Sequence, residues 1–166
     1  MSLVHQMATM VAPWADFYNG SKAAQSVVNF GHFAGIMTAG GFALAADRAT
    51  LRAAGAPAVD RPRQLQELAG THPIVVAALA VTTLSGLLMF AADLENLATS
   101  VTFWIKMGLI GLLLFNGWLM LQAERTLELG NPTDSRGWQR LRRAALVSLM
   151  LWFAVVLVGS ILPNTN

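Results

Sequence analysis

Four long apolar segments constrain this chain more than any other feature of its sequence. They lie at 27–46, 74–92, 101–121 and 144–162. Each is close to the roughly 20 residues that a helix needs to cross a bilayer core of about 30 Å. Backbone groups in lipid must bond within the segment, and the segments lack the period-two alternation of barrel strands, so each is predicted to be a helix. The predicted fold class is all-α, an integral membrane four-helix bundle.

The overall composition agrees with burial in lipid. Of 166 residues, 55% are hydrophobic and only 12% are charged, far from the balance of an ordinary soluble domain. Only about eight residues separate the second and third segments, so these two are expected to be antiparallel neighbours in an up-down bundle. The sequence pI of about 9.7 does not require a nucleic-acid partner, because topology and anionic lipid already account for the basic residues.

The basic residues predict the orientation of the bundle. All nine arginines fall between the first and second segments or between the third and fourth, which makes 47–73 and 122–143 the predicted cytoplasmic loops. The opposite side carries Lys22, Asp93 and Glu95. Both termini are therefore expected outside the cytoplasm, with residues 27–166 forming the bundle. The arginines are Arg48, Arg52, Arg61, Arg63, Arg125, Arg136, Arg140, Arg142 and Arg143.

Residues 1–26 are expected to form a separate extracytoplasmic segment. Apolar side chains recur there at helical spacing, which predicts an amphipathic helix lying on the outer membrane interface. Trp14 and Tyr18 suit the level of the lipid headgroups as interfacial anchors, and Pro13 is expected to kink the helix. The alternative is that this segment packs on a partner subunit.

Two ionisable residues at membrane depth are the candidate cofactor-binding residues. His32 and Lys106 each lie about five residues inside the outer end of a segment, roughly 8 Å below the boundary. Such residues are functional candidates because burying their charge in lipid is costly. A haem propionate or a quinone oxygen could use Lys106 while His32 binds the group. The alternative is structural: Lys106 reaches the interface or pairs with Asp93, and His32 bonds a neighbouring helix.

A haem b held by two histidines does not fit the sequence. His72 enters the second segment from the cytoplasmic side, so it is expected near the surface opposite to His32. His5 would pair with His32 only if the N-terminal helix folded over the bundle. Cysteine is absent and the methionines are scattered, so no metal site is predicted.

Small residues and one amide are the candidate packing and assembly positions. Gly31 and Gly35 form a small-residue stripe on the first segment, and Gly108 and Gly111 form a similar pair on the third. Such stripes serve close packing inside the bundle or an assembly face for another subunit. Asn116 is expected to bond across to another helix for about 1 kcal/mol.

Several motifs carry a family resemblance that extends over most of the chain from about residue 14. They are His32-Phe-Ala-Gly35, Asp47-Arg-Ala-Thr-Leu-Arg52, His72-Pro73, Ser85-Gly-Leu-Leu-Met-Phe90, and Phe103-Trp-Ile-Lys-Met107 with Asn116. This pattern resembles uncharacterised four-helix inner-membrane proteins of bacteria, which are distantly similar to the membrane domain of copper-resistance D proteins. The resemblance implies the architecture and a bacterial inner-membrane location, and it directs attention to His32 and Lys106. It implies no activity.

Three classes of function remain. The favoured hypothesis is a non-enzymatic accessory subunit that packs against other membrane subunits, with an energy-transducing or electron-transfer complex as one such assembly. The second is a small haem b or quinone protein that uses His32 and Lys106. The third is a transporter of a small ion or metal, which requires a polar path through the middle of the bundle. An enzyme is not predicted, because no nucleophile, base and acid come together. Apart from lipid and partner subunits, the sequence identifies no ligand.

Overall fold

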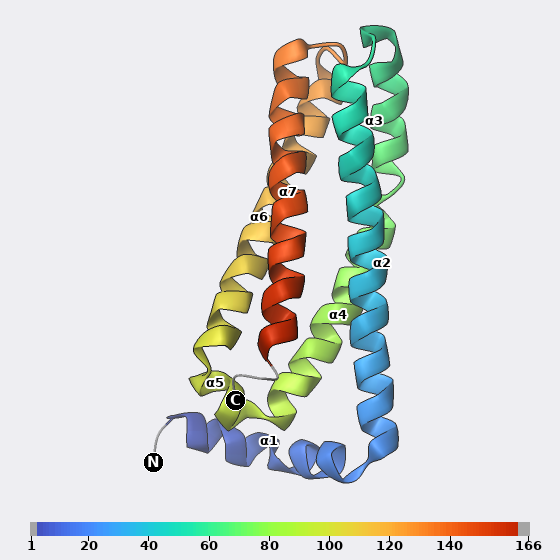
Figure 1. The fold of residues 1–166 in the computed structure, drawn as a ribbon. Coiled ribbons are helices and arrows are strands. Elements are labelled where there is room, and N and C mark those ends of the chain that lie inside the picture. The colour runs from blue at the N-terminus through green and yellow to red at the C-terminus, as the bar shows by residue number, and fades with distance from the viewer. Residues whose placement is uncertain (1–2, 163–166) are drawn as a thin grey trace.

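The computed structural model describes residues 3–162, and within them it is helical with no strand (Figure 1). This confirms the predicted all-α class, and four stretches are long and apolar enough to cross a membrane. The predicted positions of the two chain ends concern residues 1–2 and 163–166, which lie outside the described residues. The elements are α1 (Leu3–Gly20), α2 (Lys22–Gly55), the 3-10 turn η1 (Ala58–Asp60), α3 (Arg61–Ala69), α4 (His72–Ala92), α5 (Leu94–Thr99), α6 (Val101–Leu129) and α7 (Ser135–Ile161).

The four long helices pack unevenly. Helix α2 packs along α4 and along α7, and α7 packs along α6. The expected close packing of α4 against α6 is missing, although α5 joins them. Side chains link this fourth side instead: the rings of Phe90 and Phe103 stack at 5.0 Å, and His72 bonds Glu124. The short connection therefore fixes chain direction without bringing the two backbones together.

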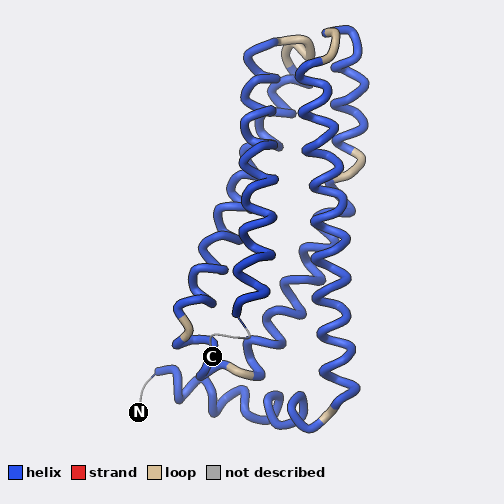
Figure 2. Tube along the Cα trace, in the orientation of Figure 1, coloured by secondary structure: helices blue, strands red, loops and turns tan. Residues whose placement is uncertain are grey.

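The long helices extend well beyond the lengths that lipid requires. Helix α2 has 34 residues, about 51 Å at 1.5 Å per residue, against a bilayer core of about 30 Å. Residues 47–73 and 122–143, expected as loops, are mostly helical, and only short loops remain between elements (Figure 2). Asp134 starts α7 early because its carboxylate accepts hydrogen bonds from the amides of Arg136 and Gly137.

Apolar burial explains why these extensions are ordered. At the end of the bundle that carries α3, here called the α3 end, a cluster of apolar side chains is almost completely buried. Burial of these side chains stabilises the helix extensions by about 25 cal/mol for each Å² of apolar surface removed from water. We call this cluster the α3-end core. Its members are Ala53, Leu65, Leu68, Leu127, Trp138 and Leu141.

A second apolar cluster closes the middle of the bundle. Ala39, Ala78, Leu113 and Trp152 come from α2, α4, α6 and α7 and are buried together. Gly40 lies directly beneath Trp152, because a Cβ atom at Gly40 would be 3.5 Å from the indole ring. We call this cluster the central core. It separates the polar groups at the two ends of the bundle.

Helix α1 runs across the opposite end of the bundle, here called the α1 end (Figure 1). The helix is continuous through Pro13, so the expected kink does not interrupt it. Trp14 Nε1 donates to the carbonyl of Leu88 at 2.8 Å, and Asn19 donates to that of Ala92 at 3.4 Å. These bonds attach α1 to the last turns of α4.

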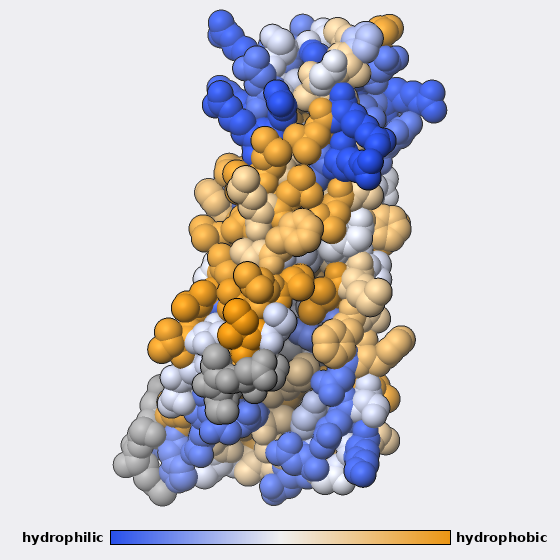
Figure 3. All heavy atoms as spheres, viewed as in Figure 1, coloured by the Kyte–Doolittle hydropathy of each residue, from blue (hydrophilic) through white to orange (hydrophobic). Residues whose placement is uncertain are grey.

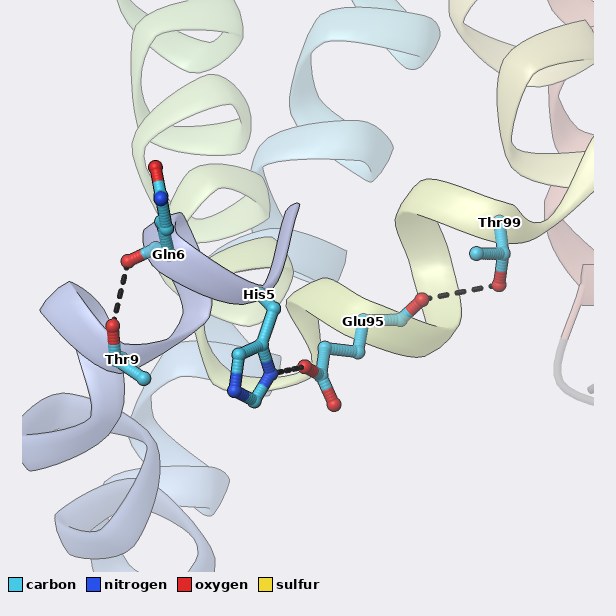
Figure 4. Close-up of polar contacts among 5 residues, drawn as sticks. All are labelled: His5, Gln6, Thr9, Glu95 and Thr99. Atoms are coloured by element: carbon cyan, nitrogen blue, oxygen red, sulfur yellow. Dashed lines mark hydrogen bonds and ion pairs between the residues drawn. The ribbon is translucent and has the colours of Figure 1, made fainter. Parts of the chain in front are cut away.

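The first turns of α1 are attached to α5. His5 Nδ1 lies 3.0 Å from Glu95 Oε1, and the two side chains point toward each other from neighbouring helices (Figure 4). His5 therefore pairs with Glu95, and the His5–His32 pairing considered above does not form. Both side chains are about half exposed, so the pair contributes less than about 1 kcal/mol to the stability of the fold.

The surface has the distribution expected of a membrane-spanning bundle. Hydrophobic side chains form a band around the middle of the visible face, and hydrophilic side chains gather at both ends (Figure 3). Large exposed apolar residues of the four long helices include Phe33, Met37, Leu84, Phe115 and Phe153. An exposed apolar area of this extent is stable in lipid and not in water.

Candidate functional site

His32 is fixed by helix α4. Its Nδ1 lies 3.1 Å from the carbonyl oxygen of Thr82 and 3.1 Å from Ser85 Oγ. Gly86 provides room for the ring, because a Cβ atom there would be 3.3 Å from His32 Cε1. The imidazole is thus held between α2 and α4 in one orientation.

The carbonyl of Thr82 also determines the tautomer of the neutral His32 ring. A backbone carbonyl can only accept, so Nδ1 carries the proton and donates it. The lone pair then belongs to Nε2. A ring whose Nδ1–H is bonded to a carbonyl is the usual arrangement for a histidine that binds a metal through Nε2. It is also a sufficient interhelical hydrogen bond without any ligand.

Lys106 lies on α6 against α7. Its Cε and Nζ would be 3.5 Å from a Cβ atom at Gly159, so the lysine stem rests where α7 has no side chain. Its charge is close enough to act on His32. Among residues 3–162, no ion pair joins Lys106 to Asp93 and no hydrogen bond joins it to His32. The two candidate residues therefore share one region without direct contact.

His72 lies far from His32. On α4, His72 precedes Thr82 by ten residues, which is about 15 Å along the helix. His32 bonds Thr82 and Ser85, so the two histidines cannot bind one haem. This agrees with the sequence argument against a bis-histidine site.

The four candidate glycines differ in their surroundings. Gly35 is buried, and a Cβ atom there would overlap Thr82 Oγ1 and lie 3.0 Å from the carbonyl of Ala78. At Gly31 it would make an ordinary contact with Val81 at 3.9 Å. At Gly108 or Gly111 it would meet nothing within 4 Å. Close packing inside this chain therefore depends on Gly35 and not on the α6 pair.

Asn116 bonds across to α7, as the sequence predicted. Its Nδ2 donates to the carbonyl of Ala144 at 3.0 Å, and the residue is buried. The acceptor is an ordinary helix carbonyl, so this bond holds α6 to α7. It is a packing contact.

A polar layer missed by the sequence analysis lies between the central core and the α3-end core. It consists of Asp47, Thr50, His72, Glu124 and Ser148, and all except His72 are buried. His72 Nε2 lies 2.7 Å from Glu124 Oε2. Ser148 of α7 and Glu124 of α6 are both close enough to act on the Asp47 carboxyl. We call these five residues the buried polar layer.

Helical periodicity could have located this layer. On α2, Asp47 follows Gly35, Ala39 and Ala43 at intervals of four, which continues the buried face of small residues. On α6, Glu124 follows Asn116 and Met120 in the same way. Hydropathy alone places the two carboxylates in loops, because it ends each span where charged residues begin, although the helices continue beyond that point.

Neither polar region resembles a closed metal site. Within the part of the chain that the structure describes, no group of three or more His, Asp or Glu side chains is arranged to hold a metal ion. Comparisons with protein-family models, with curated proteins and with solved structures find no match to this chain. A functional interpretation therefore depends on the geometry of the chain itself.

Proposed function

We propose that this chain is a multi-pass protein of a bacterial cytoplasmic membrane, with the α3 end in the cytoplasm. In this arrangement α2, α4, α6 and α7 form an up-down bundle, and α1 lies as an amphipathic helix on the extracytoplasmic interface. The distribution of charge supports the orientation, because the nine arginines belong to residues 48–63 and 125–143, which form the α3 end. Trp14 and Tyr18 then lie at the outer headgroup level.

The orientation predicts where a membrane-impermeant thiol reagent will react in intact cells. The chain has no cysteine, so single-cysteine variants can be compared directly. A cysteine replacing exposed Asn96 in α5 should be labelled, and one replacing exposed Ala58 in η1 should be labelled only after the cells are opened. Labelling of Ala58→Cys but not Asn96→Cys in intact cells would reverse the proposed topology.

We infer that the chain acts as a non-enzymatic accessory subunit that packs against other membrane subunits, of an energy-transducing or electron-transfer complex in the preferred case. Several polar side chains at membrane depth already bond within the chain: Asn116 bonds Ala144, and His32 bonds Thr82. What the middle of the chain presents to its surroundings is apolar surface. Helix association in lipid depends on small residues that let backbones approach.

An open groove between α2 and α4 is the observation that carries this proposal. Its lining is apolar and rich in small side chains, so a helix from another subunit could approach both backbones. The groove runs along the lipid-level part of the two helices. Its lining residues are Ala34, Gly35, Thr38, Pro73, Ile74, Ala77, Ala78 and Val81.

Filling the groove should release the chain from its assembly. Ala77 is exposed in the groove, and Ala77→Leu would occupy it without entering the interior of the bundle. After gentle extraction from native membrane, wild-type protein should migrate in a large complex on a native gel, and Ala77→Leu should migrate as a smaller species. Ala80→Leu, at an exposed position outside the groove, is the matched control. Unchanged migration of Ala77→Leu would reject the groove as the assembly face.

A second candidate function is binding of a haem or quinone near the α1 end. The observation that favours it is the commitment of His32 Nδ1 to the carbonyl of Thr82, which leaves Nε2 to bind iron or accept from a ligand. Lys106 supplies a nearby positive charge. A haem protein would show a Soret band that His32→Ala abolishes and Lys106→Met weakens. A native band without its own Soret absorption would leave only the quinone form, which extraction and mass analysis would test.

Transport across the membrane is less well supported. A transporter needs a polar path between its two surfaces. In the described residues, the central core of Ala39, Ala78, Leu113 and Trp152 lies between His32 and the buried polar layer. The conformation seen here is closed to ions at that level.

A further inference from the structure

The buried polar layer contains groups whose interactions inside the chain are incomplete. Asp47 is 2% exposed and Thr50 is fully buried. Asp47 Oδ2 and Thr50 Oγ1 have no hydrogen-bond partner among the described residues. Both come from one face of α2, one helical turn apart, and both point into the bundle. Buried polar atoms are almost always paired, so the unpaired oxygen of the Asp47 carboxyl requires a physical explanation.

The negative charge of an ionised Asp47 favours a positive species at this oxygen. An ionised carboxylate buried with one unpaired oxygen, and with Glu124 nearby, is strongly unfavourable because its charge is neither solvated nor paired. Protonation removes this charge and leaves a neutral carboxyl, which is far less costly to bury. A proton is therefore the smallest species that removes the charge of the buried Asp47 carboxyl.

A short chain of titratable groups leads from Asp47 to the surface of the α3 end. Glu124 of α6 is 5% exposed and acts on Asp47. His72 of α4 bonds Glu124 at 2.7 Å, and its side chain is 33% exposed. Glu128, one turn further along α6, acts on His72. Helix α7 contributes the neutral hydroxyl of Ser148, and Arg61 of α3 bonds the carbonyl of Ala54, two turns along α2 from Asp47.

We propose that Asp47 is a proton-binding site that exchanges with water at the α3 end through Glu124 and His72. A proton enters from water at His72 and passes to Glu124, and from there to Asp47. Each donor loses the proton that the next group gains, so no other reactant is needed. The central core ends the path, because it offers no titratable side chain beyond Asp47 in the described residues. The site is therefore loaded from one side of the membrane only. This proposal is independent of the accessory role.

Infrared spectroscopy of the purified full-length protein tests the proposal. At neutral pH, wild-type protein should show the C=O stretch of a buried carboxylic acid, shifted in deuterated water and absent in Asp47→Asn. Asp16→Asn, which changes an exposed carboxylate on α1, should leave the band unchanged. Asn mimics the neutral acid, so Asp47→Asn should melt no lower than wild type. If this variant does not fold, aspartate labelled with heavy carbon at its side-chain carboxyl assigns the band in wild-type protein.

The rate at which the Asp47 carboxyl exchanges its proton for deuterium tests the proposed path. After transfer to deuterated water, the Asp47 band should shift at least tenfold more slowly in His72→Gln than in wild type. Glutamine keeps a donor near Glu124 but cannot relay a proton. Equal exchange rates would reject the path. Absence of an Asp47-dependent carboxylic acid band at neutral pH would show that Asp47 is not protonated and would reject the proposal. A melting temperature that rises with sodium or potassium concentration would then assign the site to a metal cation.

Discussion

Replacement of Gly35 by alanine should destabilise this protein by about 2–3 kcal/mol, because the added methyl group has no space. The new Cβ atom would overlap Thr82 Oγ1 and lie 3.0 Å from the Ala78 carbonyl and 3.1 Å from the Thr82 amide. The Thr82 side chain could rotate only by losing its bond to the Ala78 carbonyl. The two backbone atoms cannot move without separating α2 from α4.

Thermal unfolding in detergent measures this effect. We expect the melting temperature of Gly35→Ala to fall by about 5–10 °C, from the usual relation between free energy and melting temperature in chains of this size. Gly111→Ala is the matched control, since its methyl group would meet nothing within 4 Å, and it should melt within about 1–2 °C of wild type. Equal losses of stability in the two variants would contradict the close approach of α2 and α4 at Gly35.

Truncation of Trp138 should be the most damaging single change at the α3 end. Its ring is 1% exposed in the α3-end core, with the guanidinium of Arg61 5.7 Å from the ring centre. Its Nε1 donates to the carbonyl of Pro132 at 2.8 Å. Trp138→Ala removes these interactions and leaves a cavity, which costs about 3–5 kcal/mol.

The measurement is again unfolding in detergent, combined with limited proteolysis. Trp138→Ala should melt about 10 °C below wild type and should be cut between α2 and α4 at protease concentrations that leave wild type intact. Trp118, which is 52% exposed at membrane level, provides the control, and Trp118→Ala should resist cleavage as wild type does. Equal protease resistance of all three proteins would show that the α3-end core does not hold these helices.

The predictions from sequence agree best with the structure where a single physical cost decides the outcome. The four apolar segments and the interhelical bond of Asn116 follow from the cost of exposing polar groups to lipid. The polar segments at the α3 end are predicted less well. A hydropathy criterion ends each predicted membrane span where charged residues begin. The helices continue there because residues of different helices, such as Leu65 and Trp138, are buried against one another. The sequence of a single segment does not show which residues of other helices will cover it.

The sequence by itself determined the all-helical class, the four apolar segments and the separation of His32 from His72, because length and hydropathy along one chain are sufficient for these. Only the tertiary structure decided which helices approach closely, that Gly35 matters inside the bundle and Gly111 does not, and that Asp47, Glu124 and His72 belong to one buried layer. The physical reason is that burial and pairing depend on side chains from other helices. Asp47 and Glu124 are 77 positions apart in the sequence, and only the packing of the helices places both in one buried layer.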